Sequence, residues 1–218
     1  MQKINAHNNF YFFTASLVLL LLVSAFVNST ADGENTRVMS MVILVTELVA
    51  FFSLNLSPAW RRFVGLMFVC LIVGQVFREF TDWTLAPLVG LSVCLIFFSG
   101  MAFAAARQVL FTGGVELNTI VGTIVVYLLL GLIWTFLYLI TLQFWPAGIN
   151  GIEDREWHDN FGQVAYYSYI TMTTVGYGDI TPAIAVTRTL AYLQAITGTF
   201  YMAIVVASMV GGFIRKSK

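Results

Sequence analysis

Long apolar stretches, separated by short polar segments, follow one another along almost the whole chain. A helix needs about 20 apolar residues to cross a bilayer, and six stretches approach or exceed that length. They are residues 10–27, 38–56, 63–80, 85–106, 117–144 and 183–214. The pattern therefore predicts an all-α membrane protein with six transmembrane helices.

A different pattern lies between the last two stretches. Residues 145–182 contain a polar loop, then the apolar and aromatic run 161–172, then the glycine-rich run "TTVGYGD" at 173–179. Non-helical backbone at membrane depth is tolerated only where it is buried in protein or lines a watery path. Glycine permits backbone conformations that other residues resist, so this run can point successive carbonyl groups the same way. We expect a re-entrant short helix, with its negative carboxyl end towards a cation path, followed by a loop that lines the path.

The glycine-rich run resembles the selectivity filter of six-transmembrane-helix potassium channels, whose carbonyl oxygens replace the hydration shell of K⁺. The matching residues are Thr174, Val175, Gly176, Tyr177 and Gly178. Thr173 and Asp179 extend the match on either side. The resemblance implies a passive, potassium-selective channel, assembled as a homotetramer because each chain carries one filter strand. It implies K⁺ as the permeant ion, bound by the carbonyls of residues 174–177 and the Thr174 hydroxyl, with no other cofactor.

The resemblance also extends to residues around the filter. Aromatic residues on the pore helix brace the filter of these channels, and here Tyr166 and Tyr167 stand where tryptophans are common. Gly198 resembles the glycine hinge of the inner pore helix, although close packing is an alternative reading of a glycine inside a helix. Helical spacing from Gly198 places three residues on one face, and they are Met202, Val206 and Val210. This face either forms a hydrophobic gate that closes by dewetting or packs helix against helix.

The fourth apolar stretch, residues 85–106, contains no charged residue, and Arg107 follows at its end. A voltage sensor needs several basic residues there, because voltage acts only on charge moved through the membrane field. We therefore expect weak or no voltage dependence. Glu47, in the second stretch, is an ionisable group inside a predicted span and hence a gating candidate. We favour a structural interpretation over this one, namely a carboxylate that is paired, protonated or turned towards water.

The distribution of basic residues predicts the orientation of the spans in the membrane. If the amino terminus is cytoplasmic, seven basic residues lie on the inner side and four on the outer side, as the positive-inside rule requires. The protein is then a multi-pass protein of the cell membrane with both termini cytoplasmic. The pair Gly113 and Gly114 divides the chain into a sensor-like four-helix domain without gating charges, residues 1–112, and a pore domain, residues 113–218. The pore domain comprises the outer helix, pore helix, filter and inner helix.

Composition excludes several other classes. The chain is 59% hydrophobic and 10% charged, with a net charge of +0, so it offers no basic surface for nucleic acid. Cys70 and Cys94 lie in apolar runs, where cysteine acts as a small hydrophobe. We find no phosphate loop, metal cluster or triad spacing, and expect no enzyme. Two alternatives to a channel that conducts by itself remain. They are a potassium uptake transporter and a regulatory channel subunit that conducts only with another chain.

Overall fold

The computed structural model describes residues 9–27, 35–54, 58, 61–62, 64–69, 85–111 and 117–216 of the chain. Helices make up most of this described part, in agreement with the predicted all-α class. The main elements are α1 (Asn9–Val27), α2 (Asn35–Ser53), α4 (Ala86–Phe111), α5 (Leu117–Phe144), the short 3₁₀ helix η1 (Pro146–Gly148), β1 (Ile149–Asn150), α6 (Trp157–Met172), β2 (Thr181–Pro182) and α7 (Ala185–Lys216).

The helices follow the predicted apolar stretches closely. α5 has the predicted limits, while α4 continues to Phe111, so that Arg107 lies within the helix and not after it. Two helical segments of the described part, Ala86–Val109 and Leu117–Phe144, are long and apolar enough to cross a membrane by length and composition. Shorter apolar segments occupy Phe10–Phe26 and Val38–Ser53. The total of six spans stays a prediction.

Two of the sequence predictions fall largely outside the described residues. Of the third apolar stretch, 63–80, the structure describes residues 64–69, which are helical. Cys70 lies outside the described residues, as does the predicted domain boundary at 112/113. Nothing in the described part therefore tests the division into two domains.

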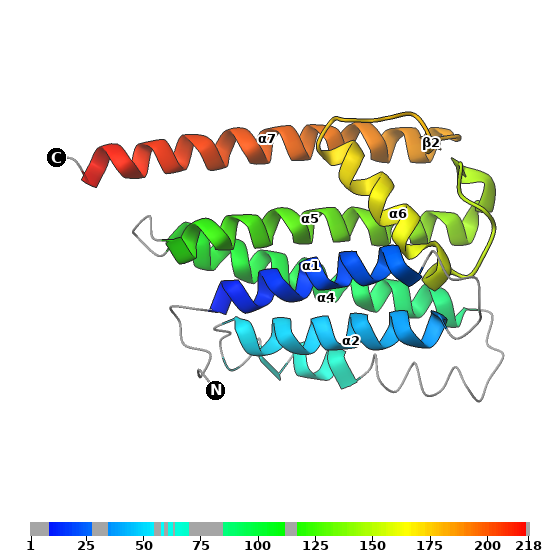
Figure 1. Cartoon of the computed structure of the whole chain (residues 1–218), viewed down its shortest axis with the longest axis horizontal. Coiled ribbons are helices and arrows are strands. Elements are labelled where there is room, and N and C mark those ends of the chain that lie inside the picture. The colour runs from blue at the N-terminus through cyan, green and yellow to red at the C-terminus, as the bar shows by residue number, and fades with distance from the viewer. Residues whose placement is uncertain are drawn as a thin grey trace.

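Figure 1 shows the long helices lying side by side along the bundle, with α6 crossing them obliquely. α4 packs along α5, α2 packs on α1, and α1 also contacts α5. α6 runs from a contact with α1 and α2 to a contact with α7. These contacts all lie within one chain. The start of α1 and the end of α7 lie at the same end of the bundle (Figure 1).

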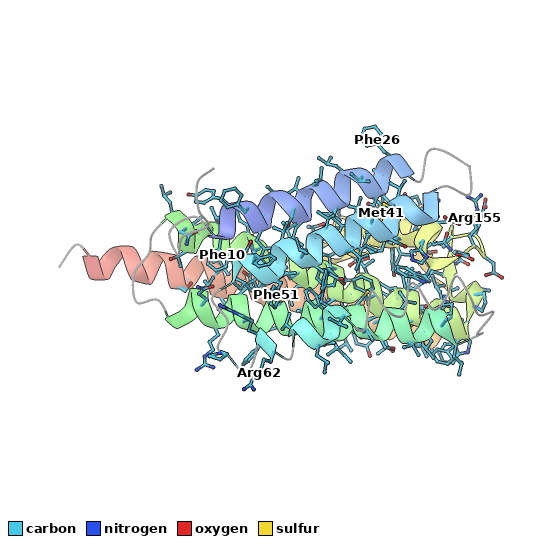
Figure 2. All side chains as sticks on the ribbon, turned by 90° about the horizontal axis from the view of Figure 1, so that it is seen from below. Phe10, Phe26, Met41, Phe51, Arg62 and Arg155 are labelled. Carbon is cyan, nitrogen blue, oxygen red and sulfur yellow. The ribbon has the colours of Figure 1, made fainter. Side chains whose placement is uncertain are left out.

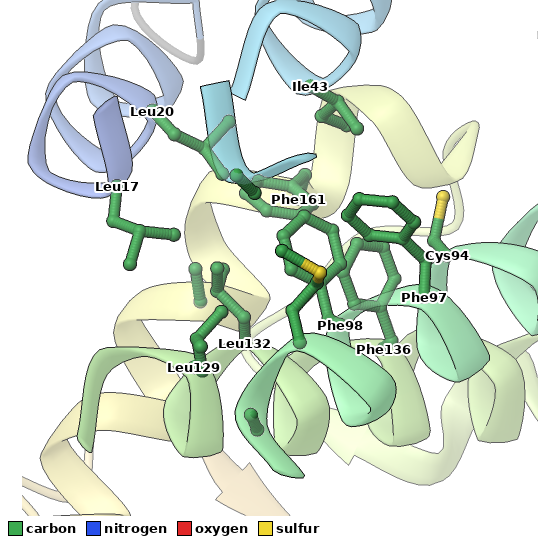
Figure 3. Packing of buried hydrophobic residues seen from close by; sticks show 14 of the residues in the cluster. Leu17, Leu20, Ile43, Cys94, Phe97, Phe98, Leu129, Leu132, Phe136 and Phe161 are labelled. Atoms are coloured by element: carbon green, nitrogen blue, oxygen red, sulfur yellow. The ribbon is translucent and has the colours of Figure 1, made fainter. Parts of the chain in front are cut away.

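A row of aromatic rings joins three of these helices (Figure 3). Phe98 of α4 stacks on Phe136 of α5, with ring centroids 5.4 Å apart and planes 16° from parallel. Phe136 in turn contacts Phe161 of α6 at 5.8 Å. All three side chains are fully buried, and offset aromatic pairs of this kind add about 0.5–1.5 kcal/mol each beyond the area they bury. The row fixes the first half of α6 against the amino-terminal helices.

The outer faces of α1 and α2 are apolar and exposed. Figure 2 shows Phe26 pointing away from the bundle, and Phe26 and Met41 are both largely exposed. Extended apolar surfaces are rare on soluble monomers and mark contact with lipid or protein. Arg62 and Arg155 lie towards opposite ends of α2 in this view (Figure 2), which is the arrangement expected of polar ends on an apolar bundle.

Candidate functional site

α6 is the element that positions the glycine-rich run. It begins at Trp157, four residues before the predicted start at 161, and ends at Met172 as predicted. The Tyr169 hydroxyl donates to Leu128 O of α5 at 2.6 Å, and the Ser168 hydroxyl donates to Gly131 O at 2.7 Å. These two bonds tie the carboxyl-terminal half of α6 to α5.

Gly131 allows this close approach and was not among the predicted site residues. A Cβ atom at this position would lie 2.2 Å from a ring carbon of Tyr169. The ring has little freedom to move, because its hydroxyl is bonded to α5. A glycine inside an apolar helix costs about 1 kcal/mol relative to alanine, and that cost was the one available signal of a packing role.

Hydrogen bonds set the direction of the first carbonyls of the glycine-rich run 173–179, the predicted filter run. The backbone N–H groups of residues 174–176 donate to carbonyl oxygens in the last turn of α6, at 2.9 to 3.2 Å. The described part has no cis peptide bond, and in a trans peptide the carbonyl points opposite to the N–H that follows it. The carbonyls of residues 173–175 therefore point away from α6, towards the exposed side of the chain.

The backbone of this run also alternates in handedness. Thr174, Gly176 and Gly178 have φ angles of +61°, +49° and +86°, whereas the intervening Val175 and Tyr177 are not in this region. Alternation of left- and right-handed residues aligns successive peptide groups on one side of the chain. Thr174 is the only non-glycine residue with positive φ in the described part, and such strain costs about 1–3 kcal/mol. The chain thus holds a row of parallel carbonyls at a conformational cost.

The whole run 173–179 is exposed in the single chain. Val175 has 51% of its accessible surface exposed and Tyr177 has 74%. Large apolar and aromatic side chains beside an aligned row of carbonyls form a surface suited to cover by protein, since backbone polar groups at membrane depth need partners. The predicted binding residues therefore lie together on one exposed edge of the single chain.

The two predicted supporting tyrosines take different roles. Tyr166 donates its hydroxyl hydrogen to Asp179 Oδ2 at 2.7 Å, and thereby connects the middle of α6 to the far end of the filter run. Tyr167 is buried instead and packs edge-on against Tyr138 of α5, with centroids 5.0 Å apart. Thr173 caps α6, its hydroxyl donating to Tyr169 O at 2.7 Å. Tyr166 therefore holds the far end of the run, Thr173 ties its first residue to α6, and Tyr167 fixes α6 on α5.

The Tyr166 hydroxyl bond lowers the pKa of the Asp179 carboxyl below its ordinary value of 3.8. A lowered pKa means that the bond stabilises the ionised form, and that this stabilisation is lost as the pH falls through the lowered value. In Tyr166→Phe we expect the pKa of Asp179 to rise towards 3.8. Titration of the Asp179 carboxyl carbon by NMR between about pH 2 and 6, the range that brackets ordinary Asp values, measures the change.

A matched control for this titration is Tyr167→Phe, which removes the neighbouring hydroxyl on the side of α5. It should leave the titration midpoint of Asp179 where it is. Equal midpoints in the unaltered chain and in Tyr166→Phe would show that the phenol does not hold the carboxylate.

A clip joins the chain before α6 to the chain after the glycine-rich run. β1 pairs antiparallel with β2, so that Ile149 faces Pro182. The Thr187 hydroxyl donates to Gly148 O at 2.7 Å. Gly151 has φ +85°, and a Cβ atom there would lie 2.6 Å from Asp179 O. The clip thereby anchors the far end of the filter run, a feature that the sequence analysis did not foresee.

α7 contains the predicted hinge and the residues predicted to form a gate. α7 is one continuous helix through Gly198, and a Cβ atom on Gly198 would lie 2.2 Å from Met172 O, the last carbonyl of α6. This contact favours the close-packing alternative for Gly198. Met202 is exposed in the single chain, while the side chains of Val206 and Val210 lie outside the described residues. The hinge and the hydrophobic gate stay predictions.

Glu47 is fully buried in α2. Neither of its carboxylate oxygens has a hydrogen-bond partner in the described part of the chain. The Cys94 thiol of α4 faces it without the geometry of a hydrogen bond. In the described part of the chain the carboxylate makes no hydrogen bond to the filter run, so no such contact joins Glu47 to the other predicted site residues.

Comparison with known proteins gives a family match for the carboxyl-terminal part of the chain. Residues 122–214 match a family model described as "Ion channel". The matched region takes in most of α5, all of α6 and the filter run, and α7 as far as Ile214. No curated protein and no solved structure matches the chain significantly. The match supports an ion channel family, which suggests a non-enzyme, and the apolar helices together with it suggest a membrane protein.

Proposed function

We propose that this protein is a potassium-selective channel. The observation that carries the proposal is the backbone of residues 173–178, with its outward carbonyls and alternating handedness. Carbonyl oxygens are hard ligands without net charge, which suits a monovalent cation better than a divalent one that recruits carboxylates. K⁺ would bind the carbonyls of Thr174, Val175, Gly176 and Tyr177, with the Thr174 hydroxyl completing the innermost site.

The channel would consist of four copies of the chain around one axis. A single chain contributes one row of carbonyls, and a dehydrated cation needs ligands from all sides. The exposed Val175 and Tyr177 side chains would be covered by this assembly. The protein would lie in the cell membrane with both termini cytoplasmic, which the common position of the start of α1 and the end of α7 supports (Figure 1).

Conduction would depend weakly or not at all on voltage. α4 is the helix that would carry gating charge, and Arg107, exposed near its end, is its one charged residue. Moving a single charge across the membrane changes the energy by about 2.3 kcal/mol per 100 mV, far less than the multi-charge sensors of steeply gated channels supply. The helix is also packed against α5 along its length, which favours a fixed position.

Purified protein in liposomes and planar bilayers tests the proposal. We expect passive K⁺ flux, a K⁺ conductance much larger than that for Na⁺, and an open probability that changes little with voltage. Equal flux of the two ions, or no flux, would contradict potassium selectivity. Saturating flux at rates far below channel conduction would indicate a transporter, and conduction only after addition of a second, different chain would indicate a regulatory subunit.

A further inference from the structure

A buried glutamine on α7 holds α5 and α6 together. The Gln194 side-chain nitrogen donates to Ser168 O at 2.9 Å and to Ser168 Oγ at 2.7 Å. Its oxygen Oε1 accepts from the Tyr138 hydroxyl at 2.8 Å. The three side chains are fully buried in the single chain. Both amide donors and the amide oxygen are therefore engaged, from two different helices.

The network continues through Ser168 into α5. Having accepted from Gln194, the Ser168 hydroxyl donates to Gly131 O at 2.7 Å. A polar group buried without partners is costly, whereas a fully satisfied buried network fixes one arrangement of the elements that it joins. An apolar residue would serve packing alone at position 194. The glutamine instead determines how the three helices sit relative to one another.

The place of Ser168 gives this arrangement a consequence for the filter run. Ser168 lies two and three residues before Ile170 and Thr171, whose carbonyls accept the N–H groups of residues 174–176. A shift or rotation of the end of α6 therefore turns the same peptide groups whose carbonyls point outwards. Gly198, one turn beyond Gln194 on α7, abuts Met172 O. α7 thus contacts two successive turns of α6 next to the filter.

We propose that Gln194 is a positioning residue for ion selectivity, acting through Ser168 on the end of α6. The inference rests on the proposed potassium channel function and names the residue that fixes the spacing of its ligands. Gln194 touches no ion itself. Its role is to hold α6 in the one position at which the filter carbonyls match a K⁺ ion.

Gln194→Met tests the role, because methionine keeps the length of the side chain and removes its hydrogen bonds. We measure the permeability ratio of K⁺ to Na⁺ from reversal potentials of purified protein in planar bilayers, a quantity that is independent of how many channels insert. We expect the ratio to fall roughly tenfold or more, which corresponds to about 1.4 kcal/mol of ion discrimination. Tyr138→Phe should lower the ratio less, since the amide keeps both of its donors to Ser168.

The double variant Tyr138→Phe with Gln194→Met should be no less selective than Gln194→Met alone, because both changes remove the same network. Thr141→Val is the matched control. It removes a buried hydroxyl on α5 that donates to Leu137 O of its own helix, and should leave the permeability ratio unchanged. A purely structural role for Gln194 would lower the yield of assembled protein but not the ratio.

The possible outcomes separate the two proposals. An unaltered chain that conducts K⁺ and Na⁺ equally overturns the proposed function. A selective unaltered chain together with an equally selective Gln194→Met overturns the role of Gln194 alone. If Gln194→Met does not assemble, Tyr138→Phe decides, since a lowered ratio supports the inference and an unchanged ratio overturns it.

Discussion

Gly198→Ala is expected to lower the thermal stability of the protein sharply and to abolish its K⁺ flux. The added Cβ atom would lie 2.2 Å from Met172 O and 2.7 Å from Met172 Cγ. Met172 is buried and ends α6, so the carbonyl cannot yield without moving the filter run. Alanine gains about 1 kcal/mol of helix propensity over glycine. Overpacking a close contact costs typically about 1–3 kcal/mol or more, and here the obstacle is backbone.

The measurements are the Tm of the purified protein in detergent and K⁺ flux into liposomes. Gly90→Ala is the matched control, since Gly90 also lies within a helix and a Cβ atom there would meet nothing within 4 Å. It should keep or raise the Tm, because only the propensity gain applies. The hinge hypothesis makes the opposite prediction for Gly198→Ala, namely an unchanged Tm with a lower open probability, and that result would contradict the close-packing interpretation.

Gly176→Ala is expected to remove potassium selectivity while leaving the fold of the single chain intact. Gly176 has φ +49°, a left-handed conformation that costs an L-residue roughly 1–2 kcal/mol. Nothing lies within 4 Å of the position where its Cβ would be, so the cost in the single chain is conformational alone. Alanine would relieve that cost by rotating the peptide group, and this rotation would turn one carbonyl of the proposed ion path.

Bi-ionic reversal potentials and the Tm together test this expectation. We expect a permeability ratio of K⁺ to Na⁺ near one, or no conduction, with a Tm close to that of the unaltered chain. Gly148→Ala provides the comparison in the clip before α6, because Gly148 is not among the glycines with positive φ and its Cβ would have neighbours at an ordinary 3.5 Å. Retained selectivity in Gly176→Ala would show that the left-handed backbone is dispensable.

The extent of sequence prediction differs between local and long-range features. The limits of α5 and the end of α6 follow from apolar runs that break at polar or glycine-rich segments, and these are visible in the chain itself. The alternating backbone of the filter run is equally local, because glycines at 176 and 178 favour it. Position 166 was expected to support the filter. Its hydrogen bond to Asp179 depends on the distance between the phenol on α6 and the end of the filter run, and only the structure gives that distance.

The contacts between helices were not predictable in the same way. Gly131, Ser168 and Gln194 lie in stretches that were assigned as apolar helices, where many faces of similar hydrophobicity could meet. Only the packed structure shows which face of α7 meets which turn of α6. A glutamine inside an apolar stretch was the one available sign of a buried network, as Glu47 was a sign of a buried carboxylate in the second helix.

The packing of α4 and α1 on the α5 helix of the same chain bears on how the protein is made. Each copy can bury its aromatic row of Phe98, Phe136 and Phe161 before it meets another copy, because that row lies within one chain. Neighbouring helices in the sequence are also neighbours in space, and such local contacts favour fast folding. In the proposed tetramer, only the edge that carries the filter run would need partner chains. Protein concentration would therefore govern the assembly of the tetramer and not the folding of each chain.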